Sequence, residues 1–169
     1  ARVPGIRPET LARLPVLPGV TYPLCLTGGG RAERAKAVAD IVRDGLNWHP
    51  LERWGVWTRP GIARMRLSLP PGAGQGALRL YLGCVPAGKD TGVRLRAFGT
   101  GATPPRFTAV TAQGNARFTC VIEVEAPGQE IVVEIDAGAG TPLGTEEKPD
   151  TRRAGIGLTS FMVCAADDL

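Results

Sequence analysis

All three tryptophans of this chain lie within ten residues of one another, between Trp48 and Trp57. An indole ring offers a broad flat surface and one hydrogen-bond donor, which suits stacking on the apolar face of a sugar ring. Trp48 and Trp57 are therefore candidate ligand-binding residues. Clustered tryptophans are also typical of a core corner where a helix is followed by the first long strand. That structural alternative is favoured for Trp54 and Trp57.

Charged residues in two clusters extend this candidate site. Glu52 lies between the tryptophans, and a carboxylate buried there needs a partner. Asp150, Arg152 and Arg153 form a second cluster far along the chain. Both clusters precede expected strands, so they can meet at one end of the fold, where loops commonly carry binding sites. We predict a pair between Glu52 and either Arg152 or Arg153, more often a structural tie than a ligand contact. The candidate ligand-binding residues are Trp48, Glu52, Trp57, Asp150, Arg152 and Arg153.

Catalytic motifs are missing from the sequence, and no catalytic residue is assigned. His49 is the only histidine, and it precedes a proline, which favours extended chain. No G-x-S-x-G elbow and no D-x-D motif occurs. The three glycines at 28–30 precede a helical pattern without the lysine and serine or threonine of a phosphate-binding loop. A glycosidase-like pair among the 16 acidic residues stays open.

The cysteines favour a reducing compartment, and no cofactor or metal is expected. Cys25, Cys84, Cys120 and Cys164 are widely separated, with no C-x-x-C spacing and a single histidine in the chain. Three of them fall on the apolar phase of an expected strand, which predicts small buried thiols. The cysteines thus predict a reducing compartment such as the cytoplasm. A disulfide between neighbouring strands, and with it a periplasmic or surface location, stays open.

Composition excludes several classes of protein. With 43% hydrophobic and 21% charged residues, the chain is globular rather than disordered. The net charge of +4 is not gathered into a basic block, so no nucleic-acid partner is expected. No apolar run reaches the roughly 18 residues of a membrane helix, so no membrane span is expected. The 23 glycines and 15 prolines indicate many short strands and turns.

The first 46 residues divide into an arm and a helical segment. Four prolines in residues 1–20 predict an extended arm or linker. In residues 21–46 we expect a short strand at 22–27 and an amphipathic helix packed on the rest of the domain. Its apolar stripe recurs at three- and four-residue steps, and Gly45 lies where a helix commonly stops. The stripe consists of Ala35, Val38, Ala39, Val42 and Leu46.

From residue 47 to 169 the pattern is that of a single β domain. Apolar residues alternate with polar ones, which antiparallel strands with one wet face require. The expected strands lie at 63–69, 78–84, 93–97, 117–125, 131–136 and 155–164. We predict a mainly β fold, a two-sheet antiparallel β-sandwich of jelly-roll or galactose-binding-like type with one N-terminal amphipathic helix. A closed barrel is the alternative architecture.

Outward positions of these strands separate the charges along the chain. Opposite charges facing each other across strands contribute about 0.2–1 kcal/mol per pair, while like charges destabilise. We therefore predict that basic strands lie beside acidic ones, as a Greek-key order arranges them. The outward arginines are Arg64, Arg66, Arg79, Arg94 and Arg96, and the outward acids are Glu123, Glu125, Glu134 and Asp136.

Two motifs resemble one family. The run W-x3-E-x-W-G-x-W at 48–57 and the late D-T-R-R-x-G-I-G-L at 150–158 resemble a β-sandwich accessory domain attached to bacterial glycosyltransferases of surface-polysaccharide assembly. The resemblance covers roughly residues 45–165. It implies a non-catalytic carbohydrate-binding or accessory module, with a glycan as ligand and the catalytic domain of a glycosyltransferase as partner. A protein–protein assembly domain without sugar affinity is the alternative, and a glycan-acting enzyme is the third hypothesis.

Overall fold

The computed structural model describes residues 15–26, 32–89, 91–125, 127–144 and 146–166, with side chains in the helix described from Lys36 onward. Within these described ranges, one α-helix, α2 (Ala32–Val42), and one short 3-10 helix, η1 (Ala73–Gln75), accompany twelve strands. The strands are β1 (Tyr22–Pro23), β2 (Arg43–Asp44), β3 (Val56–Trp57), β4 (Ile62–Ser68), β5 (Leu78–Pro86), β6 (Gly92–Gly99), β7 (Thr108–Thr111), β8 (Phe118–Glu125), β9 (Glu130–Asp136), β10 (Thr141–Pro142), β11 (Arg153–Ala154) and β12 (Ile156–Ala165).

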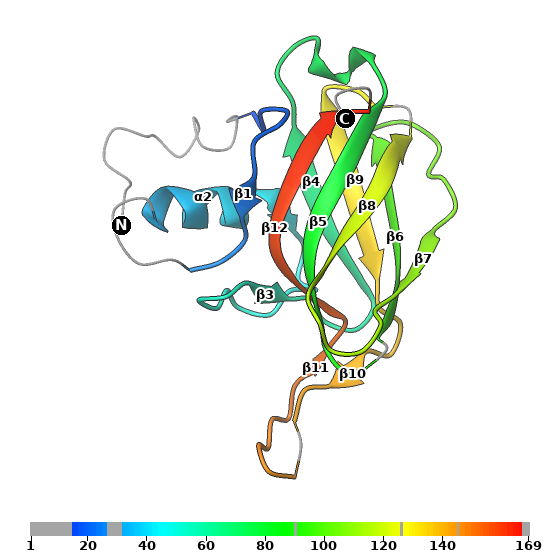
Figure 1. Ribbon diagram of the computed structural model, residues 1–169. Helices are drawn as coiled ribbons and strands as arrows, with labels where there is room; N and C mark the ends of the chain where they lie inside the picture. The colour runs from blue at the N-terminus through cyan, green and yellow to red at the C-terminus, as the bar shows by residue number, and fades with distance from the viewer. Residues whose placement is uncertain (1–14, 27–31, 90, 126, 145, 167–169) are drawn as a thin grey trace.

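The predicted mainly β class is confirmed, but most strands join one curled sheet. Its order is β1-β12-β5-β8-β6-β9-β4-β2, with β3 on β12 and β7 on β6, while β10 and β11 pair separately. Figure 1 shows β12, β5 and β8 lying in front of β4, β9 and β6. A parallel pairing, with Ala97 opposite Val124, connects these two layers. The described residues therefore form one continuous curled sheet, and its pairing is not wholly antiparallel as predicted.

Alternating apolar residues fill the space between the two layers. Strand β5 alternates strictly between buried and half-buried positions, with Leu80 and Leu82 fully buried. Strand β9 departs from the predicted pattern, because its five central residues are all buried, including Glu134. The reason is its place between β4 and β6, whose arginine side chains lie across its outer face.

The predicted pairing of basic with acidic strands is confirmed at β4, β9 and β6. Glu134 is bound from both sides, by Arg64 Nη2 and by Arg96 Nη2, each at 2.7 Å. Arg94 pairs with Asp136, and Arg66 pairs with Glu130 at 3.2 Å. Burial alone would raise the pKa of Glu134, but the two guanidiniums outweigh it and hold that pKa below its ordinary value. The fifth arginine, Arg79, lies opposite Glu123 in the register of β5 and β8.

Residues 15–26 and 32–59 lie along the seam where the curled sheet does not close. Helix α2 contacts both β1 and β4, and it buries Val38, Ala39 and Val42. The helix ends at Val42 because Arg43 and Asp44 pair with β4 as strand β2. Leu46 was expected on the apolar stripe, yet it lies beyond the helix and is 91% exposed.

The described part of the proline-rich arm also lies on this seam. The Val16 amide donates to the Ser68 carbonyl at 2.6 Å, and the Gly19 amide donates to the Val163 carbonyl at 2.7 Å. The first contact reaches the end of β4 and the second reaches β12. Residues 15–20 thus bridge the two edges of the sheet at one end.

All four cysteines are buried free thiols; burial was predicted for Cys84, Cys120 and Cys164, and Cys25 is buried as well. Burial raises the pKa of Cys84 to about 12. Among the residues that the structure describes, no helix is long and apolar enough to cross a membrane.

Candidate functional site

The two sequence motifs form one unit at the seam of the sheet. Residues 48–58 make a hairpin, the tryptophan hairpin, closed by a bridge between Trp48 and Thr58. Its turn is set by the Glu52 amide, which donates to the Gly55 carbonyl at 2.8 Å. Its second arm joins the late motif, because Trp57 lies opposite Gly157 in the pairing of β3 with β12. Segments about 100 residues apart thereby share one piece of sheet.

Glycines permit this close approach. A methyl group added to Gly157 would lie 2.7 Å from Trp54 Cη2 and 3.0 Å from Trp57 Cζ3. A methyl group at Gly55 would lie 2.3 Å from the Leu158 carbonyl oxygen. Both distances are shorter than van der Waals contact. The glycines of the two motifs are therefore explained by backbone packing and by room for the indole rings.

Trp54 and Trp57 form the accessible aromatic part of the hairpin. Their ring centroids are 4.7 Å apart at an interplanar angle of 64°, an edge-to-face contact. Both residues are half-buried. Trp48, in contrast, is 7% exposed, and its indole donates to the Arg64 carbonyl at 3.1 Å. This burial argues against the stacking role predicted for Trp48, because the ring is committed to the core beside β4.

A charged network lies at the turn of the hairpin. Arg152 Nη2 donates to Asp150 Oδ2 at 2.9 Å, and the Arg152 amide donates to Asp150 Oδ1 at 2.9 Å. Arg152 Nη1 lies 3.6 Å from Glu52 Oε2, an ion pair longer than a hydrogen bond. The hydrogen bonds from Arg152 hold the pKa of Asp150 below its ordinary value. The structure therefore brings together Glu52, Asp150 and Arg152.

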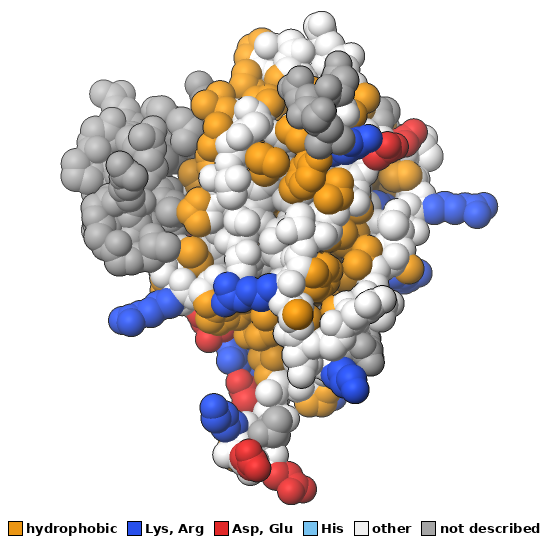
Figure 2. Space-filling model, in the orientation of Figure 1, with side chains coloured by type: hydrophobic (Ala, Val, Ile, Leu, Met, Phe, Trp, Pro, Cys, Tyr) orange, Lys and Arg blue, Asp and Glu red, His pale blue; other side chains and the backbone are white. Residues whose placement is uncertain are grey.

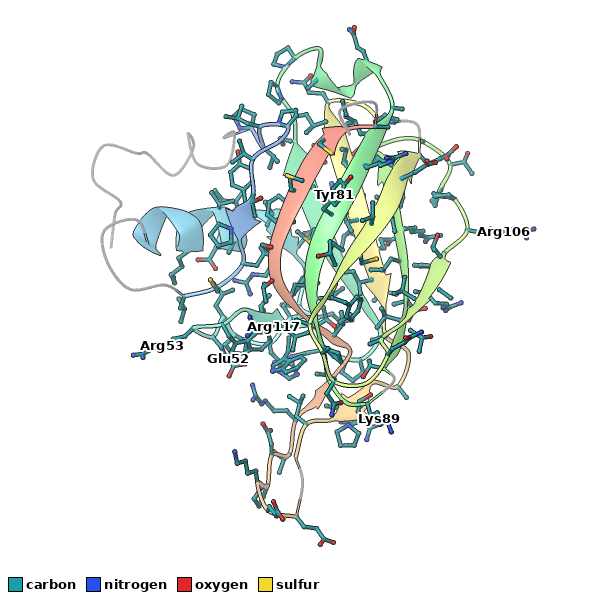
Figure 3. The ribbon with its side chains drawn as sticks, in the orientation of Figure 1. Glu52, Arg53, Tyr81, Lys89, Arg106 and Arg117 are labelled. Atoms are coloured by element: carbon teal, nitrogen blue, oxygen red, sulfur yellow. The ribbon has the colours of Figure 1, made fainter. Side chains whose placement is uncertain are left out.

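Glu52 is the least satisfied member of that network. Its Oε2 atom is buried and accepts no hydrogen bond from any described residue. A carboxylate oxygen removed from water normally accepts a hydrogen bond. Here the atom instead makes the longer ion pair with Arg152 Nη1 at 3.6 Å. Figure 3 shows Glu52 beside Arg53 at the turn of the tryptophan hairpin.

Arg153 does not join the network, so of the two predicted partners of Glu52 only Arg152 is used. The Arg153 guanidinium donates to the carbonyls of Ala139 at 3.1 Å and Gly140 at 3.0 Å. Its own carbonyl lies 2.8 Å from His49 Nε2. Arg153 thus ties the turn before β10 to the tryptophan hairpin, which is a structural role.

The outer face of β12, β5 and β8 adjoins the tryptophans. In its register, Tyr81 lies opposite Met162 and Val121. The neighbouring row contains Gly83, where an added methyl group would lie 2.5 Å from Thr159 Oγ1 and 2.9 Å from Ser160 Oγ. Figure 2 shows this face as a mixture of hydrophobic side chains and uncharged atoms, with few charged side chains; one of them is Arg117, which Figure 3 labels in front of the sheet. It offers aromatic, apolar and hydroxyl groups on one surface.

Sequence reasoning missed three features of the site. A core position was favoured for Trp54, but the structure leaves Trp54 half-buried, as it does Trp57. His49 was seen only as a residue before proline, although its ring is held by the Arg153 carbonyl. Gly83 and Gly157 interrupt apolar strands, and a glycine inside a strand is a sequence signal for close approach of another group. No group of three or more potential ligands for a metal ion occurs in the described part of the chain.

Comparisons with known proteins give little further guidance. No protein-family model matches the chain, and no curated protein sequence is similar to it. A solved structure described as CBM35 from Paenibacillus barcinonensis is 10% identical, and the match covers 88% of this chain and 100% of that one with a TM-score of 0.41. A similarity of this size does not assign a function.

Proposed function

We propose that this chain is a non-catalytic carbohydrate-binding or accessory module of a bacterial protein that assembles surface polysaccharides. The supporting observation is the half-buried pair of Trp54 and Trp57 beside the linked charges of Glu52, Arg152 and Asp150. Sugar-binding surfaces need flat apolar area together with fixed donors and acceptors for hydroxyl groups. These five residues supply both.

The contacts of Glu52 favour a hydroxylated ligand. Its side chain is 35% exposed although Oε2 is buried, and a sugar hydroxyl is a suitable donor to the exposed part of a carboxylate. Arg152 provides donors fixed by its bonds to Asp150. A sugar ring stacked on Trp57 would then be oriented by Glu52 and Arg152.

The outer sheet face can extend this contact. Gly157, beneath the tryptophans, belongs to β12, and the same face continues over Gly83 and its two neighbouring hydroxyls to Tyr81. Because this surface is mostly uncharged, it suits further units of a glycan. We also propose that the two layers of the curled sheet correspond to the two sheets of a jelly-roll sandwich.

The state of Asp150 argues against its acting as the acid of a glycan hydrolysis. A glycosidase needs one carboxyl group that remains protonated near neutral pH to act as an acid, and burial or a like charge usually raises its pKa. Arg152 instead holds the pKa of Asp150 below its ordinary value. An ionised carboxylate of this kind accepts hydrogen bonds and does not donate a proton.

The wider assignment rests on the resemblance of the two motifs. We propose a glycosyltransferase as the parent or partner protein, with the chain in the bacterial cytoplasm. The four buried free thiols are compatible with a reducing compartment.

A glycan array tests this function. The wild-type chain should bind at least one class of bacterial surface glycan, and Trp57→Ala should lose that binding. Gly76→Ala serves as the control, because a methyl group there meets no atom within 4 Å. Absence of binding to every glycan on a broad array would count against the function.

A second candidate is an assembly domain without sugar affinity. It is favoured by Leu17 and Val20, which are 50% and 41% exposed on the segment that bridges the sheet edges. This function predicts that the chain binds a glycosyltransferase catalytic domain. Leu17→Ser should weaken that binding, and added glycan should leave it unchanged. Sugar binding that depends on Trp57 excludes it as the sole function.

A further inference from the structure

A cavity is lined by helix α2, strand β2 and the first arm of the tryptophan hairpin. It has a volume of about 490 Å³, within the range of roughly 300–1,000 Å³ typical of small-molecule sites. Asp40 and Arg43 line it from helix α2 and strand β2, and His49, Pro50 and Arg59 line it from the hairpin and its end. Of the six candidate ligand-binding residues predicted from the sequence, only Trp48 lines it.

The charges of this cavity leave one guanidinium available. Asp40 is bound by Arg43 Nη2 at 2.6 Å and by Lys36 Nζ at 3.3 Å, so its negative charge is compensated. Arg43 is further held by the Ala39 carbonyl. Arg59 is exposed, and within the described residues its guanidinium forms no ion pair or hydrogen bond. The cavity therefore carries one uncompensated positive charge.

His49 lines the cavity, and its ring is held by the Arg153 carbonyl. The residue is 8% exposed, and its Nε2 lies 2.8 Å from the Arg153 carbonyl oxygen. Because a carbonyl oxygen can only accept, Nε2 carries the proton. In the neutral ring Nδ1 is then a hydrogen-bond acceptor, and no described residue donates to it. The bond to Arg153 fixes the plane of the ring and hence the direction of this acceptor.

Leu46 and Pro50 supply the apolar part of the lining. Leu46 is 91% exposed, the highest value among the large exposed hydrophobic residues of the described chain. An apolar surface beside one cation and one acceptor is the arrangement that a charged sugar ring needs, since a pyranose has an apolar face and a polar edge.

We infer that this cavity binds an acidic monosaccharide unit, a pyranose with one carboxylate. The carboxylate pairs with Arg59, a hydroxyl donates to His49 Nδ1, and the apolar ring face lies on Leu46. The inference rests on the proposed function for the choice of a sugar, and it deepens that function by naming the ligand's charge. A phosphate dianion fits less well, because only one guanidinium is unpaired and the Asp40 carboxylate lines the same cavity.

The single histidine of the chain makes a direct experiment feasible. The imidazole resonances of the intact protein report on His49 alone, and they are followed by NMR near neutral pH at constant ionic strength. D-glucuronate, D-glucose, acetate and inorganic phosphate are added in separate titrations. We expect a saturable shift with D-glucuronate and binding at least about tenfold weaker for glucose and acetate. No saturable shift with D-glucuronate, or equal or tighter binding of acetate or phosphate, overturns the inference.

Substitutions test whether Arg59 binds the carboxylate. Arg59→Ala should weaken D-glucuronate binding by about tenfold to a hundredfold, because a charge-assisted pair is lost. Arg106→Ala is the matched control, since Arg106 is an exposed arginine on the opposite side of the molecule from Glu52 in Figure 3. Equal loss in both variants would show binding to net charge and would overturn the inference.

The two sites can fail separately. If His49 does not respond to D-glucuronate while glycan binding still depends on Trp57, the inference fails and the proposed function stands. If His49 and Arg59 bind D-glucuronate while no glycan binding depends on Trp57, the tryptophan site fails and the cavity stands as a site for an acidic sugar.

Discussion

Gly157 lies so close beneath Trp54 that a methyl group on its Cα would come within 2.7 Å of Trp54 Cη2. The ring cannot keep its place if the residue below it gains a side chain. Position 157 therefore controls both the packing of β3 on β12 and the orientation of the aromatic pair that we propose binds sugar.

Gly157→Ala should disturb both properties. Overpacking of this kind typically costs about 1–3 kcal/mol, so the free energy of unfolding in urea should fall by about that amount. Glycan binding should fall as well, because Trp54 and Trp57 must move. In Gly76→Ala, where the added methyl group meets nothing within 4 Å, neither quantity should change. Unchanged stability and binding in Gly157→Ala would refute the close packing.

Arg152 and Arg153 are neighbours with different roles, and their substitution should separate binding from stability. Arg152→Ala should weaken glycan binding, because Arg152 orients Asp150 and lies beside Glu52. Arg153→Ala should leave binding intact and lower the unfolding free energy by about 0.5–1.5 kcal/mol, since it donates to the Ala139 and Gly140 carbonyls. The comparison requires glycan titration and urea unfolding of both variants. Equal loss of binding in both would place Arg153 in the site.

Glu134 should be the most costly of the charged residues to neutralise. It is 5% exposed and bound by Arg64 and Arg96. Glu134→Gln should lower the unfolding free energy by about 3 kcal/mol, the lower end of the cost of breaking a buried pair. Glu130→Gln, in a pair that is largely exposed, should cost less than about 1 kcal/mol. Similar losses in urea unfolding would contradict this difference in burial.

The same carboxylate should contribute to acid sensitivity. Its pKa is lower in the folded chain than its ordinary value of about 4.3. Stability from Glu134 is therefore present above that ordinary pKa and is lost as the pH falls through the lower folded pKa. Over this acidic range, wild-type protein should lose more unfolding free energy than Glu134→Gln. Parallel pH profiles of the two proteins would argue against the lowered pKa.

The buried thiols should be inert in the folded state. Burial raises the pKa of Cys84 to about 12, so almost no thiolate is present at mildly alkaline pH. A thiol reagent should therefore modify Cys84 only as the protein unfolds, and four thiols should react in denaturant. Rapid modification of Cys84 in the native protein, or fewer than four thiols after denaturation, would contradict the structure.

Features of the fold that depend on neighbouring residues could be predicted from the sequence, whereas features that depend on contacts between distant segments could not. The period-two pattern of β5 predicts its buried and half-buried faces because each strand residue alternates locally. Charge alternation predicted that basic strands lie beside acidic ones, but neither the binding of Glu134 by both Arg64 and Arg96 nor the burial of Glu134 was predicted. Both depend on β9 lying between two arginine-bearing strands.

At the site, the sequence predicted which clusters meet but not which side chains remain accessible. Glu52 and Arg152 come together as expected. Trp48, a candidate ligand-binding residue, is buried beside β4, and Trp54, for which a core position was favoured, is half-buried over Gly157. Leu46 does not lie on the helix as predicted, because the pairing of β2 with β4 ends the helix at Val42. Each difference arises from contacts between segments distant in sequence, which local periodicity does not encode.

NMR of the three indole Nε1–H groups measures the central contact directly. A glycan that the array identifies is titrated into the wild-type chain, with the resonances assigned by Trp48→Phe, Trp54→Phe and Trp57→Phe. We expect saturable shifts for Trp54 and Trp57 and none for Trp48, whose indole is bonded to the Arg64 carbonyl in the core. Shifts confined to Trp48, or a bound glycan that moves none of the three signals, would contradict sugar binding at this hairpin.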